Sequence, residues 1–191
     1  MSYAAIQPPF TLQFREMPKK ELKAYFDWFL SQIAQRIAGL EREVRTTASL
    51  ANWNADKSPE SLSALGGWFV RHVQTRQRTP EEIREITAVS SIPISIPNQE
   101  LTNRTFSLAM DVGMYLAETL RAQHPKLEWR QFLEDKKFVD YGQPVLVGFG
   151  AVPLNPVRIV ITLAYGIADQ KQGGERLREL YDYWSRQAAK F

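Results

Sequence analysis

The chain contains no cysteine and only two histidines, His72 and His124. The lack of cysteine excludes disulfides, thiolate metal sites and cysteine nucleophiles, and it is typical of a reducing compartment. Neither histidine lies in a His-Glu-x-x-His pattern, so a metal would have to be held mainly by carboxylates, and no metal site is predicted. The Gly148-Phe149-Gly150 segment lacks the third glycine of a dinucleotide-binding loop. No cofactor is therefore predicted.

Long apolar runs and blocks of like charge are also missing. No run approaches the roughly 20 apolar residues that cross a bilayer, and residues 1–10 lack the basic start and apolar centre of a secretory signal. These features predict a cytoplasmic protein with no membrane segment. The 24 basic and 21 acidic residues, which give a net charge of +3, are interleaved along the chain. Because no basic stripe results, the sequence disfavours nucleic-acid binding.

What the chain does contain is enough apolar surface for a core, with 44% hydrophobic and 12% aromatic residues. The expected organisation is a single domain over residues 1–191. Its expected parts are an N-terminal arm at 1–17, a helical part at 18–90, and a part at 98–191 with a helix, a small sheet and a C-terminal helix pair. The predicted fold class is α+β, a mostly helical bundle with a small antiparallel β-sheet at about residues 127–149.

Apolar residues spaced three and four apart predict the helices. The first is a long amphipathic helix over 19–45, which could also support a homodimer. Ser58-Pro59 and Thr79-Pro80 are start signals for two more helices, and Thr79 with Glu82 has capping-box spacing. Further helices are expected from residue 98 or 102 to 123, after Asn155-Pro156, and from 175 to about 189. The helix after Asn155-Pro156 is expected to be central, although its β-branched residues leave a strand open as the alternative.

The small sheet is expected to be a meander of three short strands, at 127–133, 136–141 and 144–149. A turn at Glu134-Asp135 would join the first two, and Gly142-Gln143 would lead into the third. Upstream, Ile92 to Pro97 holds two prolines four residues apart, which exclude a helix or a central strand. We interpret that segment as a surface strap.

Asp111, Tyr115 and Glu118 form the main candidate for a chemical site. At positions i, i+4 and i+7 they share one face of a helix. Two carboxylates with a phenol between them could serve general acid–base chemistry or bind a hard cation. The alternative is that they are structural, because buried acids must be paired. Arg158, near the start of the apolar helix, is the candidate partner.

Two tryptophans are the candidate contacts for a protein partner. Trp53 falls in a polar connector and Trp129 in an expected strand, and exposed aromatic residues mark interfaces. The alternative is that both are folded into the core.

Residues Asp111 to Glu118, the later Trp129, the Asn155-Pro156 helix start and the Leu-x-x-Leu-Tyr-x-x-Trp ending resemble a loose group of uncharacterised bacterial proteins. That group has a Gly-x-Tyr-x-Gly-Glu-like helix, matched here by Gly113, Tyr115 and Glu118, with Ala117 in place of the second glycine. Some of its members look like immunity or accessory proteins. The resemblance implies a bacterial, cytoplasmic, non-enzymatic factor that binds another protein. A small-ligand-binding protein or enzyme using Asp111, Tyr115, Glu118 and Arg158 is the alternative hypothesis.

Overall fold

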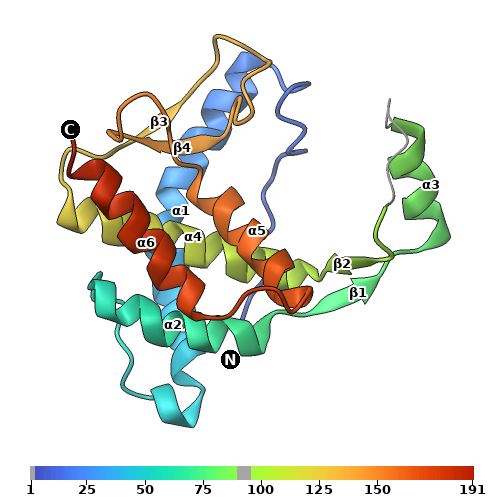
Figure 1. Cartoon of the computed structure of the whole chain (residues 1–191). Coiled ribbons are helices and arrows are strands. Elements are labelled where there is room, and N and C mark those ends of the chain that lie inside the picture. Colours follow the sequence, from blue (N-terminus) through green and yellow to red (C-terminus); the bar gives the residue numbers. More distant parts are fainter. Residues whose placement is uncertain (1–2, 90–95) are drawn as a thin grey trace.

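The computed structural model describes residues 3–89 and 96–191, and these residues fold as an α+β, mostly helical structure, as predicted (Figure 1). The helices are α1 (Lys19–Arg45), α2 (Pro59–His72), α3 (Pro80–Val89), α4 (Asn103–Gln123), α5 (Pro156–Ala168) and α6 (Glu175–Ala188), with a short 3-10 turn η1 (Ala48–Leu50). The strands are β1 (Thr75–Gln77), β2 (Gln99–Leu101), β3 (Glu128–Gln131) and β4 (Pro144–Val147). None of the described helices is long and apolar enough to cross a membrane.

Helix α4 is the centre of the fold. Every residue from Ser107 to Ala117 on it is buried, and α1, α2, α5 and α6 all pack against it (Figure 1). Gly113 allows α5 to lie close, because a Cβ at that position would be 2.8 Å from the carbonyl oxygen of Pro156. The expectation that the apolar helix after Asn155 is central is therefore wrong. Helix α5 buries one face against α4, while Val157 and Ile161 remain half-buried.

The capping residues that start the helices act as the sequence predicts. The side chains of Ser58 and Asn155 accept backbone N–H bonds at the starts of α2 and α5, and Thr102 does the same for α4. At α3 the capping box is complete, since Thr79 N donates to Glu82 Oε2 at 2.8 Å and Glu82 N donates to Thr79 Oγ1 at 3.2 Å. Local chemistry thus sets where these helices begin.

The sheet near the C-terminal half has two strands rather than three. Strand β3 pairs antiparallel with β4, and Leu146 of β4 also bridges to Leu154. The predicted strand at 136–141 is wrong, because that segment forms turns. The Asp135 side chain accepts the N–H of Lys137 at 2.8 Å, and the Asp135 carbonyl accepts the N–H of Phe138 at 3.1 Å. An aspartate that binds the following backbone favours a turn over an extended strand.

A second sheet, which the sequence did not predict, pairs β1 with β2. This ribbon carries α3 away from the other helices (Figure 1). We call the unit of β1, α3 and β2 the α3 projection. Residues 90–95, which include most of the expected strap at 92–97, lie outside the described residues. The N-terminal arm has no regular strand and passes over α1 and α4 as far as the start of α1.

Candidate functional site

Asp111 is fully buried and is held by two residues from other segments. Arg36 on α1 forms a bidentate salt bridge with Asp111, in which Nε is 2.7 Å from Oδ1 and Nη2 is 2.7 Å from Oδ2. The Tyr3 hydroxyl of the N-terminal arm donates to Oδ2 as well, and Arg36 also donates to the carbonyl of Ala4 at 3.0 Å. Asp111 thus pairs with Arg36 rather than with Arg158, and the cluster fastens the N-terminal arm to the body.

Burial dominates the electrostatics of this cluster. It raises the pKa of Asp111 from its ordinary value of 3.8 to about 6, although the Arg36 guanidinium and the Tyr3 hydroxyl act to lower it. Burial and the neighbouring carboxylate raise the pKa of the Tyr3 phenol well above its ordinary value. The phenol therefore stays protonated and serves as a donor. All polar atoms of the carboxylate are engaged by groups of this chain, which leaves none for a substrate.

Asp111 should make stability depend on pH in the direction set by its raised pKa. The folded state holds the proton of the Asp111 carboxyl more tightly than the unfolded state does. The stability that this proton contributes is therefore fully present below about pH 3.8 and is lost as the pH rises through about 6. Relative to Asp111→Asn, which cannot titrate, the wild type should gain about 1–2 kcal/mol of unfolding free energy between pH 7.5 and 4.5. Urea unfolding of both proteins at the two pH values measures this. If the difference in unfolding free energy between wild type and Asp111→Asn is the same at both pH values, then Arg36 keeps the pKa of Asp111 near its ordinary value.

Tyr115, one turn along α4, has a separate set of partners. Its hydroxyl accepts the N–H of Lys57 at 3.0 Å and lies 2.6 Å from Ser61 Oγ. Trp53 packs edge-on against the Tyr115 ring at 5.6 Å and donates its indole N–H to the carbonyl of Ser61. With only 7% of its surface exposed, Trp53 belongs to the core. The prediction that it contacts a partner is therefore wrong, because the connector folds back onto α2.

Glu118 lies near the surface and joins α4 to its neighbours. Its Oε1 accepts from Arg121 at 2.8 Å and from the Trp129 indole N–H at 3.1 Å, and Lys57 Nζ is 3.8 Å from Oε2. Trp129 is half-buried and packs edge-on against Phe29 of α1 at 5.3 Å. Its contact with a partner stays a prediction.

Arg158 pairs with Asp140, an acid that the sequence did not single out. The two side chains meet at 3.0 Å, and the buried Asp140 carboxylate also accepts from Asn155 Nδ2 at 2.9 Å. The four residues of the predicted cluster are therefore distributed over separate contacts. Within residues 3–89 and 96–191, no group of three or more acids or histidines could hold a metal ion.

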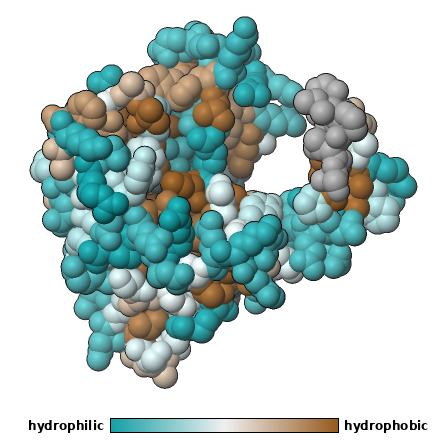
Figure 2. Space-filling view, viewed as in Figure 1, coloured by the Kyte–Doolittle hydropathy of each residue, from teal (hydrophilic) through white to brown (hydrophobic). Residues whose placement is uncertain are grey.

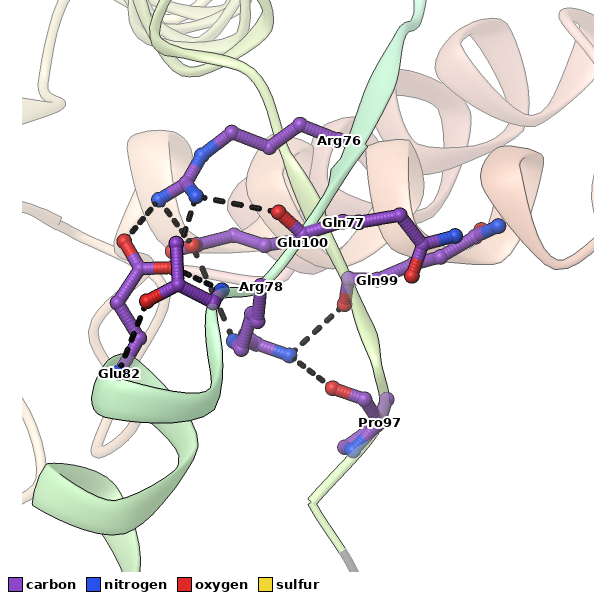
Figure 3. Close-up of polar contacts among 8 residues, drawn as sticks. Arg76, Gln77, Arg78, Glu82, Pro97, Gln99 and Glu100 are labelled. Carbon is purple, nitrogen blue, oxygen red and sulfur yellow. Dashed lines mark hydrogen bonds and ion pairs between the residues drawn. The ribbon is translucent and has the colours of Figure 1, made fainter.

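The α3 projection is the remaining candidate site, and an ion-pair network fixes its shape (Figure 3). Arg76 of β1 donates to both carboxylate oxygens of Glu82, at 2.9 and 2.7 Å, and to Glu100 of β2 at 2.8 Å. Arg78 reaches the carbonyls of Pro97 and Gln99 across the ribbon. Pairing with Arg76 lowers the pKa of Glu82 to about 2. The network therefore stays ionised at ordinary pH and fixes the direction of α3 on the ribbon.

Helix α3 presents an apolar face that the body does not cover. Ile83 is half-buried and Ile86 is 38% exposed, and neither belongs to the core or packs against it among the described residues. Figure 2 shows the projection separated from the body by open space, with apolar residues on it. Glu81, Glu82 and Glu85 outnumber Arg84 on the same helix. The sequence indicated this helix through its capping box but gave no sign that it stands apart.

Comparisons of the chain with protein-family models, with curated proteins and with solved structures find no match.

Proposed function

We propose that this protein is a non-enzymatic factor that acts by binding another protein, and that the α3 projection is the part that binds. The observation that carries the proposal is the apolar face of α3, with Ile86 exposed at the end of a ribbon braced by ion pairs. The predicted cluster does not compete with this proposal, since Asp111, Tyr115, Glu118 and Arg158 have separate partners among the described residues.

The physics of short helices supports this assignment. A helix of ten residues is marginal by itself in water, because few backbone bonds offset the cost of starting it. In α3 the capping box and the Arg76 network offset part of that cost. Among the described residues the Ile83–Ile86 face does not pack against the core, and the proposal assigns its cover to a partner. An amphipathic helix that inserts into an apolar groove is a common form of protein recognition. The acids of α3 favour a groove flanked by basic side chains.

The segment from Phe106 to Trp184 resembles immunity-like bacterial proteins, and this resemblance suggests the kind of partner. In this proposal the partner is another bacterial protein met in the cytoplasm, and the factor acts as an immunity or accessory protein. Trp129 is a candidate for a secondary contact. A homodimer through α1 is the competing assembly.

A pair of lysine substitutions on α3 tests the proposal. Ile86→Lys places a charge on the apolar face, whereas Ala88→Lys places the same charge roughly 200° around the helix, on the exposed opposite side. We expect a partner purified from the source cell to bind Ala88→Lys like wild type and Ile86→Lys at least about tenfold more weakly. Isothermal titration with the purified partner measures both dissociation constants.

Removing the projection gives the control for folding. Gln77 and Gln99 face each other across the ribbon, so an Asn-Gly turn can replace residues 78–98. The shortened protein should melt within a few degrees of the wild type and should no longer bind the partner. Equal binding by wild type and the shortened protein would refute the proposal. So would a concentration-dependent homodimer that survives the deletion and is the only assembly formed, as measured by sizing at two concentrations.

A further inference from the structure

A cavity of about 370 Å³ lies between the N-terminal arm and the body. Its walls come from segments far apart in the sequence: the arm, α1, α4, α5 and the start of β4. Figure 1 shows the arm, in dark blue, passing beside α5. The volume falls within the range of about 300–1,000 Å³ that small-molecule sites occupy. None of the residues of the predicted Asp111 cluster lines it.

The lining of this cavity selects against charge. Most of it is apolar, with Phe14, Phe29, Phe106, Met110, Val157 and Ile161 among the contributors, and no Asp, Glu, Lys, Arg or His lines it. A charged group enclosed there would lose its hydration without gaining an opposite charge. The lining therefore fits an uncharged, mainly apolar molecule.

Among the polar side chains of the lining, Gln143 and Ser107 each have a donor to spare. Gln143 accepts from Asn155 Nδ2 at 3.0 Å through its carbonyl oxygen, and its own amide N–H groups donate to no described residue. Ser107 Oγ accepts the N–H of Ile6 at 3.0 Å, and its hydroxyl hydrogen has no acceptor among residues 3–89 and 96–191. Asn155 is occupied on both sides, by Asp140 and Gln143 as acceptors and by the N–H of Arg158 as donor. Gln7, Tyr25 and Asn103 also line the cavity, and their side chains make no hydrogen bond to a described residue. Gln143 and Ser107 offer donors on the wall formed by the body, and donors suit a carbonyl oxygen.

The arm is bound at both ends, and between them Phe10 packs edge-on against Tyr25 and Trp28 of α1. Tyr3 and Ile6 are bound to α4, and a turn from Gln13 to Met17 leads into α1. Between them, Pro8 and Leu12 line the cavity, and residues 7–12 make no backbone hydrogen bond to any described part of the body. Leu12 has φ of 60° and is 41% exposed. A leucine held in the left-handed region is strained, so the backbone around Leu12, beyond the Phe10 contact, is the part of the wall that can shift most easily.

We propose that this cavity binds a small, uncharged, mainly apolar molecule that carries one carbonyl group. The apolar walls hold the body of the ligand, and Gln143 or Ser107 donates to the carbonyl oxygen. The span at residues 7–12 gives access. The site is separate from the α3 projection, so either proposal can fail without the other.

The test uses the uncharged dye 1-aminoanthracene and three competitors of equal chain length: 2-undecanone, undecane and undecanoate. The dye should brighten on binding wild type, and the ketone should displace it at a concentration at least about fivefold lower than the alkane or the carboxylate needs. Ile161→Trp, which fills the cavity, should abolish dye binding. Ile159→Trp is the matched control, because Ile159 lies on the same helix, is also half-buried and lines a different hollow between α5 and α6. Val157→Phe is the second filling variant if Ile161→Trp melts early.

Gln143→Met tests the polar contact. It keeps the length of the side chain and removes the amide. Combined with Ser107→Ala, which removes the other donor, it should bring the ketone and the alkane to within about twofold of each other. Failure of the wild type to bind the dye, or equal dye binding by Ile159→Trp and the filling variants, would overturn the site. Displacement by undecanoate at the same concentration as the ketone would overturn the uncharged class of ligand.

Discussion

Asp111→Ala is expected to lower the free energy of unfolding by about 3–5 kcal/mol at pH 7.5. The substitution leaves the Arg36 guanidinium, whose side chain is 13% exposed, without its counter-charge. The Tyr3 hydroxyl loses its acceptor at the same time. Breaking one partner of a buried pair is costly because the other charge remains desolvated. Urea unfolding followed by circular dichroism measures the loss.

A double variant separates this loss from simple cavity formation. Asp111→Leu combined with Arg36→Met leaves no buried charge, and it should recover at least half of the loss, because apolar replacements of a buried ion pair are often neutral. Since the hydrogen bonds of Tyr3 and Ala4 to the body run through this cluster, Asp111→Ala should also speed chymotrypsin cleavage at Phe10 or Phe14. A loss of under about 1 kcal/mol, with unchanged cleavage, would mean that the cluster does not hold the arm.

Gly66→Ala and Gly67→Ala should change stability in opposite directions. A Cβ at Gly66 would collide with the backbone carbonyl of Gly174 and lie 3.3 Å from the Cβ of Leu177, at the point where α2 meets the start of α6. Backbone atoms cannot turn away as a side chain can, so we expect a loss of about 1–3 kcal/mol. A Cβ at Gly67 meets nothing within 4 Å. There alanine should add about 0.5–1 kcal/mol, because it restricts the unfolded chain.

Thermal and urea unfolding of the two variants measure both effects. The substitutions are chemically identical and adjacent, so helix propensity cancels between them and the difference reports the close approach of α2 and α6 alone. Stabilisation by Gly66→Ala would show that the two backbones are further apart than the structure has them.

Much of the secondary structure could be predicted because its causes are local. The steps of three and four between Leu22 and Val44 predict α1, and the Thr79–Glu82 box and the Asn155-Pro156 start place α3 and α5. The secondary-structure predictions failed at short segments, where a strand and a turn or loop were both compatible with the sequence. Residues 136–141 have apolar members but turn at Asp135, and β1 has no apolar alternation because all of its residues are exposed.

The candidate site was less predictable, because residue type and spacing do not identify a partner. The spacing of Asp111, Tyr115 and Glu118 places them along one side of α4, as expected, yet each turns to a different neighbour. Arg158, near the start of the apolar helix, was the expected partner, but it is used by Asp140. Trp53 lies in a polar connector, and only the fold-back onto Ser61 shows that it is buried.

By itself, the sequence determined the helices, their caps and the α+β class, because helix periodicity and capping act over three or four residues. Tertiary structure alone decided which helix is central, which acid meets which base, and that α3 stands apart. The reason is the distance along the chain over which these choices are made. Tyr3 and Asp111 are 108 positions apart, and Gly66 meets Gly174 only after α2 and α6 have packed. Contacts of that kind depend on the packing of the whole core, and no local pattern records them.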